Sequence, residues 1–202
     1  MNRQELKLGG RILENLPVMT SNVMQDWIDN PKALGEFLSG LNPPEVVVPV
    51  PEPPLDFTIR VNRSVKPAYP DWVKEVMHPE LECTGPANYN LQTAVEEWLH
   101  DDQQDGSVQG GVIYTHLKKD NALADCLGLA DLLAIQTKGI AVFRKLFGDK
   151  AVFGWKSVVQ DRDIDGYLCV PCLCGDGGGV VLSWRWLGSA WGSGGPALRF
   201  RK

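Results

Sequence analysis

The chain of 202 residues lacks an excess of positive charge and lacks any long apolar run. Its 20 Lys and Arg residues are outnumbered by 25 Asp and Glu residues, which gives a net charge of -5. Such a chain does not attract the phosphates of nucleic acid or an anionic membrane surface. No run is long enough to span a membrane, and "MNRQELKLGG" does not resemble a secretory signal. We expect a cytoplasmic protein that binds neither nucleic acid nor a membrane.

An even set of regularly spaced cysteines is also missing. Of the five cysteines, Cys83 and Cys126 stand alone, whereas Cys169, Cys172 and Cys174 lie close together. Secreted disulfide frameworks usually have even counts spread through a short chain. The sequence therefore predicts reduced thiols.

Motifs for catalysis are absent as well. The sequence contains no nucleophile motif around Ser or Cys, no phosphate-binding glycine loop and no paired-carboxylate signature. His100, Asp101 and Asp102 end a predicted helix, where charged residues are usually solvated surface. We therefore expect no enzyme and no cofactor.

The segment "DRDIDG", Asp161 to Gly166, matches the start of a calcium-binding loop. The twelfth position should be a bidentate Glu but is Cys172, and predicted strands rather than helices flank the segment. A β-hairpin with Asp165 and Gly166 in its turn accounts for the same residues, and we prefer it.

The segment "CVPC" has the cysteine spacing of thioredoxin. That chemistry needs the first thiol at a helix N-terminus, whereas the residues around Cys169 predict a strand. Three close cysteines also suggest zinc, but no fourth ligand is near, because the three histidines are His78, His100 and His116. We predict no metal site.

Prolines divide the chain into two parts. A short helix capped by Ser21 and a second one from Pro31 to Leu41 are predicted before "PPEVVVPVPEPP", which reads as an extended linker. We expect a helical N-terminal segment over residues 1–44, a linker over 45–56 and one domain over 57–202. With 44% hydrophobic residues the chain can bury a core.

The domain over 57–202 reads as α+β. Residues 57–61 alternate as in a half-buried strand, and a helix is predicted from the cap Asn90 through Leu91, Val95, Trp98 and Leu99. Further predicted helices cover 113–119, 129–136 and 140–147, the last ending at Gly148. Predicted strands follow over 151–160, 166–173, 180–187 and 196–200. We expect the first and last strands to pair.

The end of the chain, "SWRWLGSAWGSGGPALRFRK", alternates large residues with small ones. The only Trp codon, TGG, contains no adenine, and Val, Leu, Pro, Gly and Ala also have adenine-free codons. Changes at adenines convert tyrosine codons into the three close cysteines and asparagine codons into Ser183 and Arg185. Asparagine and aspartate codons likewise yield the small residues over 188–195.

This pattern resembles the variable protein of a diversity-generating retroelement, in which a reverse transcriptase copies a template repeat with errors at adenine. The resemblance is strongest over residues 151–201 and weaker over 57–148. It implies a C-type lectin-like fold with a variable region at about 160–195, and a variable ligand, expected to be a protein. In "VVLSWRWL" the period of two places Ser183 and Arg185 on one face of the strand and Trp184 and Trp186 on the other. We expect the tryptophans on the packed face.

The resemblance implies a set of exposed ligand-binding positions: Arg162, Ile164, Tyr167, Cys169, Cys172, Cys174, Ser183, Arg185, Gly188, Ser189, Ala190, Gly192, Ser193, Gly194 and Gly195. Two alternatives stay open. Formylglycine-generating enzymes share the lectin-like architecture, so an enzyme or redox protein using Cys169 and Cys172 would give at least one of the three close cysteines a depressed pKa. The other is a structural adhesin tip whose helical N-terminus docks to a carrier.

Overall fold

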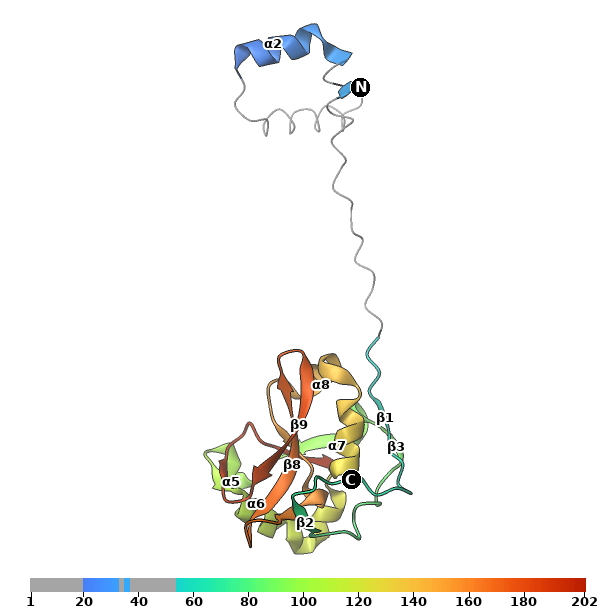
Figure 1. Ribbon diagram of the computed structural model, residues 1–202, viewed down its shortest axis with the longest axis vertical. Coiled ribbons are helices and arrows are strands. Elements are labelled where there is room, and N and C mark those ends of the chain that lie inside the picture. Colours follow the sequence, from blue (N-terminus) through green and yellow to red (C-terminus); the bar gives the residue numbers. More distant parts are fainter. Residues whose placement is uncertain (1–19, 33–34, 37–53) are drawn as a thin grey trace. The chain divides into compact units, whose positions relative to one another are not determined.

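The computed structural model describes residues 20–32, 35–36 and 54–202 (Figure 1). The chain divides into two compact units, Met1–Glu52 and Pro53–Lys202, and each is described by itself. In the first unit, helix α2 spans Ser21–Asp29. Its N-cap is Thr20, not Ser21 as predicted, and the cap makes no side-chain hydrogen bond. Residues 31–32 and 35–36 are helical, whereas most of the predicted linker falls outside the described residues.

The second unit mixes helices with antiparallel-rich sheets, so the predicted α+β class is confirmed. Its helical elements are α4 (Leu91–Ala94), α5 (Asp101–Gln104), α6 (Gly110–Lys118), the 3-10 helix η1 (Lys119–Asp125), α7 (Leu129–Gln136), α8 (Gly139–Phe147) and the 3-10 helix η2 (Trp155–Ser157). Its strands are β1 (Thr58–Arg60), β2 (Val73–Val76), β3 (Asn88–Asn90), β4 (Val95–Trp98), β5 (Val108–Gln109), β6 (Val152–Phe153), β7 (Val159–Asp161), β8 (Leu168–Asp176), β9 (Gly179–Trp186), β10 (Ala190–Trp191) and β11 (Ala197–Phe200).

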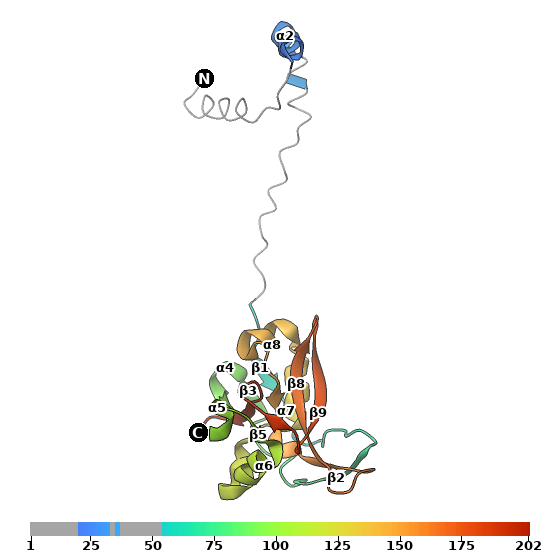
Figure 2. The ribbon, with the colours of Figure 1, turned by 90° about the vertical axis from the view of Figure 1, so that its left-hand side faces the viewer.

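Strand β8 is the centre of the main sheet. Among the described residues this sheet has the order β2-β7-β8-β6-β11-β4, and β9 pairs with β8 along its whole length. Its described pairs are antiparallel except β11 with β6. Strands β8 and β9 form a long hairpin beside α8 (Figure 2). Two smaller sheets pair β1 with β3 and β10 with β5.

Helices cover the main sheet on both faces, giving two cores. The core beside α7 and α8 includes Ile59, Leu132, Ile135, Phe143 and Leu173. The core beside α6 includes Ile113, Leu117, Phe153, Trp155, Cys172 and Trp191. Because successive residues of a strand point to opposite faces, β8 contributes side chains to both cores.

The predicted helices α6, α7 and α8 are confirmed, and each buries one stripe of apolar side chains. Helix α8 ends at Gly148, which has φ 63° and donates its N–H to the Arg144 carbonyl. Residues other than glycine rarely adopt this left-handed conformation, so Gly148 ends the helix as its position predicts.

The helix predicted from Asn90 to Leu99 is wrong after its first turn. Asn90 does cap α4, since its side chain accepts the N–H of Gln92 at 2.9 Å. The chain then becomes strand β4, because residues 95–98 pair antiparallel with β11. Main-chain pairing with a distant strand outweighs the local helical stripe.

The expectation that the first and last strands pair is also wrong. Strand β1 pairs with β3, whereas β11 lies between β6 and β4. The half-buried pattern predicted for the first strand is confirmed, since Ile59 is buried between the exposed Thr58 and Arg60.

A buried carboxyl group joins the segment before β3 to α7. Glu82 accepts the Ser157 hydroxyl at 2.7 Å, and the same hydroxyl accepts the N–H of Leu129. Burial raises the pKa of Glu82 above its ordinary value of 4.5, so the neutral acid is favoured.

This raised pKa predicts how stability depends on pH. The contribution of neutral Glu82 is complete below the unfolded pKa and is lost as pH rises through the folded pKa. Glu82→Gln should therefore gain stability relative to the parent, by up to about 1.4 kcal/mol per pH unit in that window. Urea unfolding from pH 4 upward measures the difference, and a difference that does not change with pH would contradict the assignment.

Candidate functional site

The β8–β9 hairpin fixes where most candidate positions lie. Cys169 is opposite Trp186, and Cys172 is opposite Ser183. Cys169 and Cys172 are three residues apart in one strand, so their side chains lie on opposite faces. Cys172 points into the α6 core beside Phe153, its partner in β6.

The expected exposure is wrong for two cysteines of the set. Cys169 is 6% exposed and Cys172 is 1% exposed. Because helices cover both faces of the sheet, a period of two does not separate buried from exposed positions here. Cys174 and Ser183 are half-buried, and only Arg185 among the hairpin candidates is exposed.

The tryptophans of β9 are more exposed than predicted. Trp186, expected on the packed face, is 43% exposed and lies parallel to the ring of Tyr167. Trp184 is half-buried and packs edge-on against Trp72, with ring centroids 5.3 Å apart. The hairpin therefore presents an aromatic side chain that the alternation assigned to the core.

Main-chain hydrogen bonds hold the loop that follows β9. Strand β10 pairs with β5, and the N–H groups of Gly110 and Gly111 donate to the carbonyls of Ser189 and Leu187. The N–H of Ala151 donates to the carbonyl of Gly194. These bonds use main-chain atoms of the loop, so replacing the side chains at its exposed positions Ala190, Ser193 and Gly194 removes none of them.

The buried side chain of Gln103 completes this support. Its amide group donates to the carbonyls of Gly192 at 3.2 Å and Gly195 at 3.1 Å, and its oxygen accepts the N–H of His100. Sequence reasoning missed Gln103, although the spacing of His100 and Gln103 is that of a capping box. His100 is the N-cap of α5, and it does not end a helix as predicted.

Five candidate positions line one hollow of about 200 Å³. The complete lining is Ala151, Phe153, Arg185, Ala190, Trp191, Gly192, Gly194 and Gly195. Phe153 and Trp191 are buried and stacked, with centroids 4.6 Å apart, so they form a fixed floor. The rim consists of small residues and the Arg185 guanidinium, which has no described carboxylate partner.

The turn between β7 and β8 carries Arg162 and Ile164 on the surface. The Asp161 side chain accepts the N–H groups of Asp163 and Ile164, and Gly166 has φ 74°. The predicted hairpin is confirmed by the pairing of β7 with β8. In the described part of the chain, no three His, Cys, Asp or Glu side chains are placed to hold a metal ion.

The remaining candidates do not line the hollow. Gly188 and Ser189 are half-buried in the loop, Ser193 is exposed, and Cys174 lies near the carbonyl of Val181. The structure therefore gathers five candidates around the hollow and places Tyr167 in a stack on Trp186.

Burial disfavours the thiolate form of two of the three close cysteines. Burial raises the pKa of Cys169 and of Cys172 to about 11, the opposite of the depression that the redox alternative expects at one or more of the three close cysteines. The five cysteines are free. Three strand residues span about 10 Å, beyond the Cα separation that a disulfide between Cys169 and Cys172 allows.

Alkylation rates check this assignment. A pKa of about 11 lowers the thiolate fraction about a hundredfold below that of an ordinary thiol at neutral pH. In folded protein we expect iodoacetamide to modify the half-buried Cys83 and Cys174 first, and Cys169 and Cys172 only after unfolding. Mass spectrometry of the digest locates the label, and rapid labelling of Cys169 or Cys172 would restore the redox alternative.

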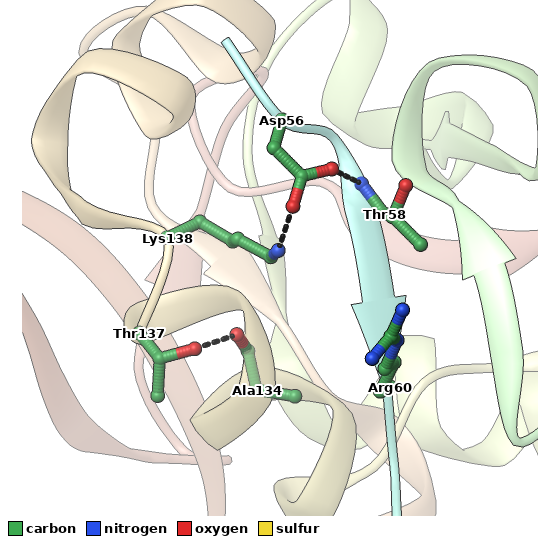
Figure 3. Close-up of a pocket in the computed structure, with 6 residues that line it drawn as sticks. All are labelled: Asp56, Thr58, Arg60, Ala134, Thr137 and Lys138. Atoms are coloured by element: carbon green, nitrogen blue, oxygen red, sulfur yellow. Dashed lines mark hydrogen bonds and ion pairs between the residues drawn. The ribbon is translucent and has the colours of Figure 1, made fainter.

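A second hollow, of about 450 Å³, lies between β1 and α7 (Figure 3). Its charges are largely paired, because Lys138 donates to Asp56 at 2.7 Å and holds the pKa of Asp56 down at about 2. Figure 3 also shows the Thr137 hydroxyl donating to the Ala134 carbonyl. None of the candidate positions lines this hollow.

Among the described residues, no helix combines the length and apolar character that crossing a membrane requires. Comparison with protein-family models, with curated proteins and with solved structures finds no match for this chain in any of the three.

Proposed function

We propose that this chain is a non-enzymatic binding protein with a C-type lectin-like domain whose C-terminal surface is diversified by a diversity-generating retroelement. The main support is the loop over residues 187–195. Main-chain bonds and buried framework side chains hold it, so the side chains at the exposed positions Ala190, Ser193 and Gly194 are free to vary. This arrangement has the logic of antibody loops on a rigid scaffold.

The binding surface is the hollow with Arg185 and the exposed loop positions, together with the Tyr167–Trp186 stack. Cys169 and Cys172 are excluded from it because they are buried. A volume of about 200 Å³ is below that of pockets for drug-sized ligands. It fits one side chain of a protein partner, and Arg185 favours an acidic one.

The surrounding DNA tests the diversification. We expect a near-copy of the nucleotides that encode residues 160–202, beside a reverse transcriptase gene, differing only where the template has adenine. Differences spread evenly over all four bases would contradict adenine-directed change. Without any such repeat the chain would be an ordinary binding domain.

Tolerance to substitution tests the framework. We expect simultaneous replacement of Arg185, Ala190, Ser193 and Gly194 by Asn to change the free energy of unfolding by about 1 kcal/mol or less, because surface changes are small. The matched control is Leu187→Ala, a buried residue of the same loop, which should cost about 2–5 kcal/mol. Urea unfolding compares the two, and a larger loss in the fourfold variant would refute the separation of framework from variable positions.

A further inference from the structure

Trp186 is held in one orientation by two neighbours. Its ring lies parallel to that of Tyr167, with centroids 4.9 Å apart and an interplanar angle of 4°. Gly188 lies against the ring near atoms Cζ2, Cε2 and Cη2. The large side chain is 43% exposed, so it has open space into which it can turn.

The position of Gly188 leaves no room for a side chain. A Cβ atom built there would lie 2.3 Å from Cζ2 of Trp186 and 2.5 Å from Cε2 and Cη2. Real Cβ contacts are not that short, so one of the two groups must move. The φ of Gly188 is outside the left-handed region, and its backbone therefore accepts other residues.

The ring moves more easily than the chain. The N–H of Leu187 donates to the Leu168 carbonyl, and the N–H of Ser189 donates to the carbonyl of Trp186. These bonds fix the backbone on both sides of Gly188. The indole is held by the stack on Tyr167 and by its contact with Gly188, and it is partly exposed.

We propose that residue 188 sets the orientation of Trp186. Glycine permits the stack on Tyr167, and any larger residue turns the indole away from it. On the proposed function position 188 is diversified and Trp186 is not, so a change at 188 repositions an otherwise constant aromatic side chain on the binding surface. Rigid aromatic side chains supply much of the contact energy of protein interfaces, so this change alters which partner fits.

The test uses the full chain labelled with 5-fluorotryptophan. The chain has seven Trp residues, and each gives a 19F signal. Trp186→Phe identifies the signal of Trp186. In Gly188→Ala we expect that signal to shift and its H2O/D2O solvent isotope effect to increase, as the indole leaves Tyr167. An unchanged signal and isotope effect in folded Gly188→Ala would overturn the proposal.

Gly194→Ala is the matched control, because a Cβ there meets nothing within 4 Å. It should leave the Trp186 signal in place. If Gly188→Ala is poorly folded, a double-mutant cycle with Trp186→Ala decides. The loss of stability caused by Gly188→Ala should disappear when Trp186 is already replaced by Ala. Equal losses of stability with and without Trp186 would refute the contact between residue 188 and the indole. The proposed function is tested separately, by the search for the DNA repeat.

Discussion

Trp191→Ala is expected to lower the free energy of unfolding by about 3–5 kcal/mol, the usual cost of removing a buried aromatic side chain. Trp191 is 7% exposed, stacks on Phe153 and lies 5.3 Å from the ring of Trp155. Its indole nitrogen, buried in the described structure, has no hydrogen-bond partner. The loss is therefore one of packing, and Trp191→Phe should recover part of it.

Urea unfolding followed by circular dichroism measures this cost. Ser193→Ala is the matched control, because Ser193 is exposed two positions further along the same loop. It should change stability by about 0.5 kcal/mol or less. Similar losses in the two variants would mean that Trp191 is not part of the fixed floor of the hollow.

Asp131→Ala is expected to cost about 3–5 kcal/mol, because it leaves a partly buried cation without its partner. The carboxylate accepts hydrogen bonds from both terminal nitrogens of Arg63, at 3.1 Å and 2.5 Å. It also accepts the Tyr89 hydroxyl at 2.8 Å and the N–H of Gly128 at the start of α7. Asp131 is fully buried, so water cannot replace these bonds.

Asp165→Ala is the control for this variant. Asp165 pairs with Lys74 at 3.3 Å, but its side chain is 91% exposed. An exposed ion pair contributes about 0–1 kcal/mol. Thermal and urea unfolding of both variants separate the two cases, and a small effect of Asp131→Ala would show that the network around α7 is dispensable.

The elements that were predicted correctly are those whose own residues carry the signal. Helices α6, α7 and α8 carry regular apolar stripes, Asn90 and Gly148 carry cap signals, and the turn before β8 carries its Asp and Gly. Strand β4 was missed because its identity depends on β11, about a hundred positions away. No local pattern contains that information.

The candidate site was predicted in part for a related reason. Alternation along β9 correctly separated the two faces, but it could not show that helices cover both of them. Cys172 was therefore placed on the surface and Trp186 in the core, and both placements are wrong. The hollow was also missed, because Phe153 and Ala151 reach it from another part of the chain.

The bonds that hold the loop over 187–195 have a consequence for the order of folding. Gln103 and Gly192 are 89 positions apart, so their hydrogen bond closes a long stretch of chain. Such contacts carry a large closure entropy and form after the local helices and hairpins. Substitutions in the loop then act mainly on the rate of unfolding. Variants that differ only in the exposed side chains of this loop would therefore share the early steps of folding.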